Sequence, residues 1–165
     1  MNQKIKSITA SLILLILFTF TLNYTYNFEA INYCNQNNSC ILKLIEDNQK
    51  FSLCKQSENI NKCYYKSSIK FNQSNLCNNL TINPTKCFHE NAIYHNSLEI
   101  CHKSGNLTNQ CIFELAIKNK NLSYCNNSDN KYYCYYSYAV ITQNSSICNI
   151  SEKYKKVCYD KIIEN

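Results

Sequence analysis

Residues 125–140 read CNNSDNKYYCYYSYAV, a stretch with two cysteines and five tyrosines and with neither glycine nor proline. The spacing of these two cysteines recurs along the chain. From Cys40 onward, steps of fourteen residues alternate with steps of nine or ten. One long and one short step make a period of 23 or 24 residues over five units, which is typical of a repeat array rather than a knotted disulfide toxin.

Aligning the units on the second cysteine of each pair shows what the repeat contains. The aligned segments are CYYKSSI, CFHENAI, CIFELAI, CYYSYAV and CYDKIIE, which begin at Cys63, Cys87, Cys111, Cys134 and Cys158, and CILKLIE at Cys40 is a degenerate first copy. An apolar residue follows the cysteine directly, and the third residue after it is polar. The fifth residue is small in four units: Ser68, Ala92, Ala116 and Ala139.

These columns fit an α-helix. At 100° per residue the apolar columns fill a broad arc, while the positions one before and three after the cysteine share a narrow polar strip. A β-strand would need alternation with a period of two, which the columns lack. A helix covered on more than one side suits the interior of a stacked array, and the small column permits close approach of a neighbour.

The first cysteine of each pair lies in a shorter segment bounded by Asn and Ser, and turn residues separate it from the second cysteine. Asn83 and Pro84 are expected to be the N-cap and first residue of one of the longer helices. Each unit is therefore predicted to be a short helix, a turn and a second helix. The predicted fold is all-α, a short α-solenoid-like array of about five hairpins plus a degenerate N-terminal unit.

Hairpin geometry favours one disulfide in each unit. Two cysteines at similar distances from a turn, such as Cys77 and Cys87 on either side of Pro84, approach the roughly 4.4–6.8 Å Cα separation that a disulfide needs. Pairing across the fourteen-residue steps is the alternative, and it would leave Cys34 and Cys158 unpaired. On the chain-entropy model each small loop stabilises the fold by about 2–3 kcal/mol. The favoured pairs are Cys34 with Cys40, Cys54 with Cys63, Cys77 with Cys87, Cys101 with Cys111, Cys125 with Cys134, and Cys148 with Cys158.

The N-terminus has the pattern of an export signal. Lys4 and Lys6 precede an apolar run, SITASLILLILFTFTL, at residues 7–22. The uncharged stretch is long enough to cross about 30 Å as a helix, and it has no clear A-x-A cleavage site.

We therefore expect residues 1–30 to be an uncleaved signal anchor, with a cleaved signal peptide as the alternative. Residues 31–165 are expected to form the repeat domain. Either kind of signal places this domain outside the cytosol, bound to the membrane or secreted, where cysteines oxidise to disulfides.

Charge and motifs exclude several classes of function. The net charge is +6, all 17 basic residues are lysines, and no clustered basic face or arginine indicates nucleic-acid binding. With one glycine the chain has no phosphate-binding loop, and no GxSxG or GxGxxG motif occurs. We expect no cofactor and no catalytic residue.

A metal site is the enzymatic alternative. Close CxxC-type pairs typical of zinc sites are absent. His89, His95 and His102 fall within two units, and His89 with Glu90 begins like HExxH, but Ile93 takes the place of the second histidine. We therefore expect solvated surface histidines, and a metal-assisted hydrolase using these residues is the less favoured alternative.

Tyr132 and Tyr133 are candidates for a binding patch. Most tyrosines of residues 125–140 fall in repeat columns that we expect to be in the core. Tyr133, however, falls in the polar strip and Tyr132 replaces polar residues of other units. Exposed tyrosine rings are amphipathic and are common at interfaces. The alternative is a chance accumulation in a tyrosine-rich chain.

The chain also contains nine N-x-[ST] sequons, which begin at Asn23, Asn37, Asn72, Asn79, Asn106, Asn121, Asn126, Asn144 and Asn149. In an exported protein such sequons are glycosylation acceptors. The same Asn and Ser residues near hairpin turns would also arise as helix caps. Both interpretations stay open.

With its columns in the pattern L-C-x(8,9)-C-[YF]-x(3)-A-[IV], the chain from about Asn32 onward resembles uncharacterised secreted proteins of small-genome archaea built from paired-cysteine α-hairpins. It is also similar in architecture to disulfide-stapled Sel1-like and tetratricopeptide repeats, which have a longer period and more glycine. The resemblance implies a binding scaffold, by analogy of fold alone.

The favoured function is therefore a non-enzymatic extracytoplasmic scaffold that binds a protein or a glycan. A structural cell-envelope component without a specific ligand is the alternative. The expected partners are an extracellular protein or glycan and, through the N-terminal segment, the membrane.

Overall fold

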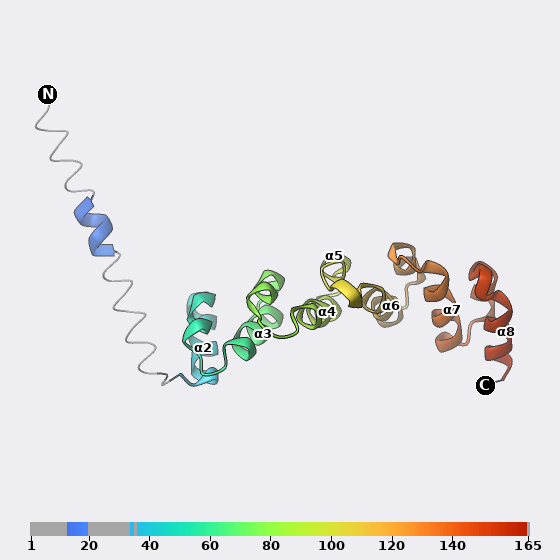
Figure 1. The fold of residues 1–165 in the computed structure, drawn as a ribbon, viewed down its shortest axis with the longest axis horizontal. Coiled ribbons are helices and arrows are strands. Elements are labelled where there is room, and N and C mark those ends of the chain that lie inside the picture. The colour runs from blue at the N-terminus through green and yellow to red at the C-terminus, as the bar shows by residue number, and fades with distance from the viewer. Residues whose placement is uncertain (1–12, 20–33, 35, 165) are drawn as a thin grey trace, which may run out of the picture. The chain divides into compact units, whose positions relative to one another are not determined.

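The computed structural model describes residues 13–19, 34 and 36–164. The described residues form α-helices and short 3₁₀ helices joined by tight turns, and none of them lies in a β-strand (Figure 1). The predicted all-α hairpin repeat is confirmed.

Each repeat combines a long helix with a short one. The long helices carry the second cysteine of each pair and are α2 (Asn38–Asn48), α3 (Ile60–Lys70), α4 (Pro84–His95), α6 (Thr108–Lys118), α7 (Lys131–Thr142) and α8 (Lys155–Ile163). The short helices carry the first cysteine and are η1 (Phe51–Gln56), η2 (Ser74–Asn79), α5 (Leu98–Cys101), η4 (Leu122–Asn127) and η5 (Ser145–Ile150), where η denotes a 3₁₀ helix. Two further 3₁₀ turns, η3 (Gly105–Leu107) and η6 (Glu152–Tyr154), precede α6 and α8.

All twelve cysteines are paired, and every disulfide closes within one hairpin, as the spacing predicts. The Cα atoms of the six pairs are 5.3–5.6 Å apart, which is within the ordinary range for disulfides. The pairs are Cys34 with Cys40, Cys54 with Cys63, Cys77 with Cys87, Cys101 with Cys111, Cys125 with Cys134, and Cys148 with Cys158.

The sulfurs lie inside the hairpins. Every cysteine except Cys40, which is partly exposed, is buried. Cys54 and Cys63, for example, are both fully buried where η1 meets α3. A buried cysteine behaves as a small apolar side chain, so the disulfides also contribute to the packing of the core.

A tight turn with one left-handed residue links each long helix to the next short helix. At the end of α6 the backbone N–H of Lys120 donates to the Ile117 carbonyl, at 3.1 Å, and that of Asn121 to the Ala116 carbonyl, at 2.9 Å. This is the Schellman arrangement, which satisfies carbonyls that a helix end leaves free. The left-handed positions have φ between 51° and 55° and recur at the repeat period: Gln49, Asn72, Asn96, Lys120 and Gln143.

Side-chain caps begin several of the short helices directly after these turns. Asn121 Oδ1 accepts from the Ser123 N–H, and Asn144 Oδ1 accepts from the Ser146 N–H. Ser97 caps α5 in the same manner. Most of the short segments are 3₁₀ rather than α-helical, in keeping with the preference of that helix for runs of only a few residues.

The predicted cap at Asn83 is only partly correct. Pro84 is the first residue of α4 and Asn83 precedes it, as predicted. However, Asn83 has a left-handed backbone, with φ of 54°, and its side chain makes no capping hydrogen bond. A capping side chain needs an extended backbone to reach the first helical N–H groups, and this conformation directs it elsewhere.

The described residues divide into two compact units, one ending at Cys63 and the other beginning at Tyr64, so the division lies inside α3. In the first unit α2 contacts η1, and Ile41, Ile45 and Leu53 are buried. The first hairpins therefore have an apolar interior of their own.

In the second unit the long helices contact one another in chain order: α4 with α6, α6 with α7, and α7 with α8. Two successive apolar clusters fill the interfaces, one around Phe88 and Ile112 and the next around Tyr138 and Ile147. Such an arrangement depends mainly on contacts between nearest neighbours.

The column of small residues, five positions after the second cysteine, allows successive hairpins to pack closely. Ser68, Ala92, Ala116 and Ala139 are all fully buried. Ser68 Oγ lies 3.3 Å from Cys87 Sγ, so the side chain of one hairpin contacts the disulfide of the next. A larger residue would hold the two hairpins apart, and the interpretation of this column is therefore confirmed.

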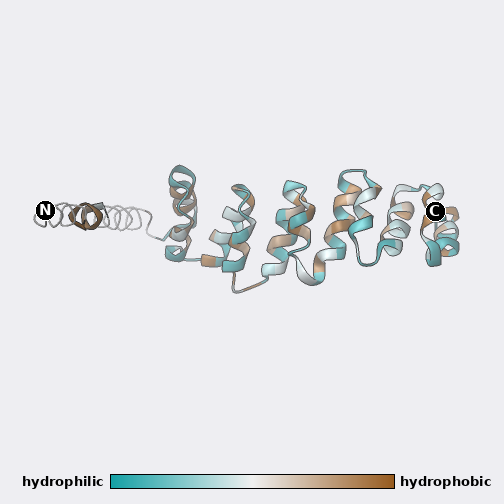
Figure 2. Cartoon of the chain, turned by 90° about the horizontal axis from the view of Figure 1, so that it is seen from above, coloured by the Kyte–Doolittle hydropathy of each residue, from teal (hydrophilic) through white to brown (hydrophobic). Residues whose placement is uncertain are grey.

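Residues 13–19 are helical and mostly apolar, as the brown colouring of this segment in Figure 2 shows. Their apolar side chains are exposed. Among the described residues no helix has both the length and the apolar character needed to cross a bilayer. Most of the predicted signal segment at residues 1–30, and its predicted boundary with the repeat domain, lie outside the described residues.

Candidate functional site

The three histidines considered as metal ligands make separate contacts. His89 Nε2 lies 3.1 Å from Glu114 Oε2, whereas His95 Nε2 donates to the Ile69 carbonyl at 2.7 Å. His102 is exposed at the end of α5. In the part of the chain that the structure describes, no three His, Cys, Asp or Glu side chains are placed to hold a metal ion. The residues of the hydrolase alternative are thus not brought together.

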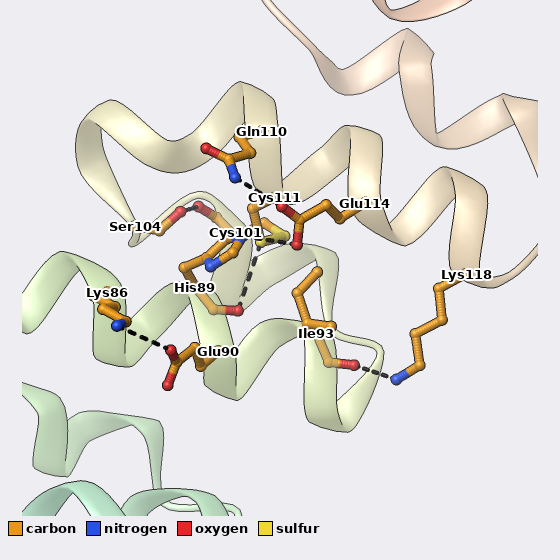
Figure 3. Close-up of polar contacts among 10 residues, drawn as sticks. All are labelled: Lys86, His89, Glu90, Ile93, Cys101, Ser104, Gln110, Cys111, Glu114 and Lys118. Carbon is orange, nitrogen blue, oxygen red and sulfur yellow. Dashed lines mark hydrogen bonds and ion pairs between the residues drawn. A yellow bond between two sulfur atoms is a disulfide. The ribbon is translucent and has the colours of Figure 1, made fainter. Parts of the chain in front are cut away.

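His89 and Glu114 instead join two successive hairpins. They face each other between α4 and α6, and Lys118 Nζ donates to the Ile93 carbonyl across the same interface (Figure 3). A groove of about 280 Å³ follows this interface, and its lining carries both signs of charge. The lining residues are His89, Glu90, Ile93, Tyr94, Glu114 and Lys118.

Glu90 is one of the acidic residues that line this groove. Burial raises the pKa of its carboxyl, although Lys86 Nζ lies 3.7 Å away one helical turn earlier (Figure 3). The pair is half exposed and is therefore a weak interaction. Nothing in its geometry resembles a nucleophile with a positioned base.

A second pocket, of about 310 Å³, lies between the N-terminal halves of α6 and α7. Its lining consists of aromatic rings, amides and hydroxyls together with one disulfide cysteine: Asn109, Gln110, Phe113, Ser128, Asn130, Tyr133, Cys134 and Ser137. This volume is at the lower end of the range for small-molecule sites, which combine apolar walls with a few placed polar groups. It is the better candidate site because its composition matches that description.

Tyr133 forms one wall of this pocket and is about half exposed. Its ring also meets the rings of Tyr136 and Tyr154, with centroid distances of 5.8 and 5.6 Å. Tyr136 and Tyr154 stack on each other at 5.6 Å, and Lys153 Nζ lies 5.1 Å from the Tyr154 ring. These contacts hold an exposed aromatic ring in a defined position at the border of the pocket.

Tyr132 makes contacts that are separate from those of Tyr133. Its ring meets Tyr135 at 6.5 Å, with Lys131 Nζ 4.8 Å from its centroid, and it does not line the pocket. Adjacent residues on a helix point about 100° apart, which separates it from Tyr133. The predicted patch of two neighbouring tyrosines is therefore divided, and only Tyr133 contributes to the candidate site.

Two amides of the pocket are fixed by hydrogen bonds. Asn109 Oδ1 accepts from Ser128 Oγ at 2.9 Å and from the Asp129 backbone N–H at 3.0 Å. Gln110 Nε2 donates to Glu114 Oε1 at 2.8 Å (Figure 3). The Asn109 bond also crosses between hairpins, and Ser57 donates to Asn38 Oδ1 at the equivalent position.

Sequence reasoning missed most of this site. Phe113 falls in an apolar column that predicts a core position, yet this column is half buried and borders the grooves. Gln110 is distinguished in the sequence only as part of the polar strip. Tyr154 lies outside the aligned columns, so the repeat pattern carries no signal for it.

The sequon asparagines are all exposed where the structure describes them, and Asn23 lies outside the described residues. Asn37, Asn121 and Asn144 accept backbone hydrogen bonds at the start of a helix. The capping interpretation is therefore supported at these three positions, and glycosylation stays a prediction.

Comparison of the chain with protein-family models, curated proteins and solved structures finds no match. The candidate site is accordingly assigned from its geometry alone.

Proposed function

We propose that this chain is a non-enzymatic, extracytoplasmic repeat protein that binds a protein or glycan partner through the pocket between α6 and α7. The observation that carries the proposal is the pocket itself. A half-exposed aromatic ring, Tyr133, lies beside apolar and amide groups, and it contacts the rings of Tyr136 and Tyr154. Tyrosine is enriched at binding surfaces because its ring offers a large contact area and few rotamers to lose.

The number of disulfides supports an extracytoplasmic location for this chain. Six disulfides in a chain of 165 residues are typical of an oxidising, extracytoplasmic environment. We propose that the N-terminal segment exports the chain and anchors it in the membrane, with secretion after cleavage as the alternative. The repeat pattern resembles that of archaeal paired-cysteine hairpin proteins and of Sel1-like arrays, and this resemblance would imply the same scaffold role by analogy of fold alone.

The test uses the full-length oxidised chain and two single variants, Tyr133→Ala and Tyr94→Ala. Tyr94 is 65% exposed and lines the charged groove on α4, so it is a matched control for losing an exposed tyrosine. We expect saturable binding to a panel of extracytoplasmic proteins and glycans that Tyr133→Ala weakens by about tenfold or more. Tyr94→Ala should bind as the wild type does.

Binding that is equally sensitive to both substitutions would contradict the assignment to this pocket. Absence of any saturable partner would contradict the binding role and favour a structural component of the cell envelope.

A further inference from the structure

We propose that the pocket between α6 and α7 takes a neutral carbohydrate, with a sugar ring lying against Tyr133. This inference rests on the proposed binding function and specifies its ligand. Three features of the pocket carry it: the absence of charge in its lining, a pair of oriented amides, and a supported aromatic ring.

The charge of the lining separates this pocket from its neighbour on α4. Its eight lining residues include no Lys, Asp, Glu or His. The groove between α4 and α6 contains His89, Glu90, Glu114 and Lys118. A charged ligand entering the uncharged pocket would lose hydration without gaining an opposite charge, which is costly. The uncharged pocket therefore favours an uncharged polar ligand.

The two neighbouring amides are held so that one offers a donor and the other an acceptor. Asn109 Oδ1 faces the Asp129 backbone N–H, which can only donate, so the oxygen and nitrogen of this amide are not interchangeable. Its Nδ2 has no hydrogen-bond partner among the described residues. Gln110 Nε2 faces the Glu114 carboxylate, which leaves Gln110 Oε1 as an acceptor.

A sugar hydroxyl both donates and accepts hydrogen bonds, so adjacent hydroxyls of one ring match this pair of amides. Each amide is already bound at one end, so little side-chain freedom is lost when a ligand binds at the other. An apolar peptide side chain would instead leave these amide groups without partners, which is unfavourable.

The aromatic ring supplies the other half of the site. The face of an aromatic ring carries partial negative charge, and the C–H groups on one face of a sugar ring are weakly positive, so the two surfaces attract. Tyr133 is suited to this contact because the rings of Tyr136 and Tyr154 contact its ring and hold it in place. Phe113 adds apolar surface to the pocket.

The test is a glycan array of neutral and acidic oligosaccharides probed with the full-length oxidised chain, followed by titration of the best neutral glycan. We expect neutral glycans to bind and acidic ones to bind less. Tyr133→Ala should weaken binding about tenfold or more, and Gln110→Leu about threefold to tenfold. Tyr133→Phe, which keeps the ring, and Tyr94→Ala should bind within twofold or so of the wild type.

Preferential binding of acidic glycans, or neutral binding unaffected by Tyr133→Ala and Gln110→Leu, would overturn the inference. If no glycan binds while an extracytoplasmic protein from the panel binds in a Tyr133-dependent manner, the carbohydrate assignment fails and the scaffold function stands. If neither class binds, both fail. Helical circular dichroism and intact disulfides in each variant exclude misfolding as the cause.

Discussion

Asn91 Nδ2 donates a 2.9 Å hydrogen bond to Ser68 Oγ, and both side chains are fully buried between two successive hairpins. Ser68 Oγ in turn donates to the Tyr65 carbonyl, while Asn91 Oδ1 has no partner among the described residues. The equivalent positions one repeat later are Ala92 and Leu115, which are apolar and also fully buried. A polar pair therefore replaces apolar packing at this one interface.

Removing half of this pair should destabilise the fold, and replacing both halves should not. Ser68→Ala leaves Asn91 Nδ2 buried without a partner and should lower the free energy of unfolding by about 1–3 kcal/mol. The double variant Ser68→Ala with Asn91→Leu copies the next interface and should be at least as stable as the wild type. Urea unfolding with the disulfides intact measures both.

Ser145→Ala is the control, because Ser145 is exposed and outside this interface. If the double variant is less stable than Ser68→Ala alone, the prediction is wrong. The polar pair would then stabilise the interface more than apolar packing at the same two positions does.

Glycine at the left-handed turn positions should stabilise the protein. Lys120 has φ of 51° and Gln143 has φ of 53°, a conformation that costs a non-glycine residue roughly 1–3 kcal/mol. Part of this gain is offset by the greater freedom of glycine in the unfolded chain, so Lys120→Gly should stabilise by about 1 kcal/mol. Thermal unfolding monitored by circular dichroism measures the change.

Lys66→Gly is the matched control, since Lys66 is an exposed lysine inside α3. It should destabilise by about 1 kcal/mol. Destabilisation by Lys120→Gly as well would contradict the turn geometry described above.

Loss of one disulfide should loosen its own hairpin and the adjacent ones rather than the whole chain. Cys125→Ala with Cys134→Ala opens a loop whose closure is worth about 2–3 kcal/mol. Because α7 contacts α6 and α8, amide hydrogen exchange should accelerate in these helices and remain slow in α4. Equal acceleration in α4 would indicate that the second unit unfolds as one cooperative body.

Glu90→Gln should stabilise the protein at neutral pH and have little effect in acid. Burial raises the pKa of Glu90 in the folded state, so the ionised carboxyl is less stable there than in the unfolded chain. The contribution of protonated Glu90 to stability is therefore fully present below the pKa that this carboxyl has in the unfolded chain. It is lost as the pH rises through the higher pKa of the folded state. Glutamine resembles the protonated acid at every pH.

The free energy of unfolding is measured for Glu90→Gln and for the wild type at pH 3 and at pH 7. We expect the difference between the two proteins to be larger at pH 7. A substitution effect of equal size at both values would assign the difference to packing rather than to charge.

The aligned columns of the repeat predict much of this fold because residues of one column make equivalent contacts between successive hairpins. The cysteine spacing predicts the pairing, since only the shorter steps are symmetrical about a turn. The column of Ser68 and the alanines predicts close helix approach, which the contact of Ser68 Oγ with Cys87 Sγ confirms.

Features that depend on backbone conformation or on contacts between non-equivalent residues could not be predicted. Lys120 and Gln143 adopt left-handed conformations without the glycine that usually marks them. Tyr154, which contacts Tyr133 of the candidate site, comes from a 3₁₀ turn that most of the described repeats lack. The hydrogen bond from Ser128 to Asn109 joins two successive hairpins across nineteen residues of sequence, and neither residue alone indicates it.

The disulfide map of the native chain is the most direct test of this account. Digestion without reduction, by cleavage after lysine at Lys131 and by chymotryptic cleavage after Tyr138, separates Cys125, Cys134 and Cys148 onto different peptides. Mass spectrometry should then find Cys125 linked to Cys134, and the same hairpin pairing for the other ten cysteines. A link from Cys134 to Cys148, or twelve free thiols, would contradict the stapled-hairpin fold.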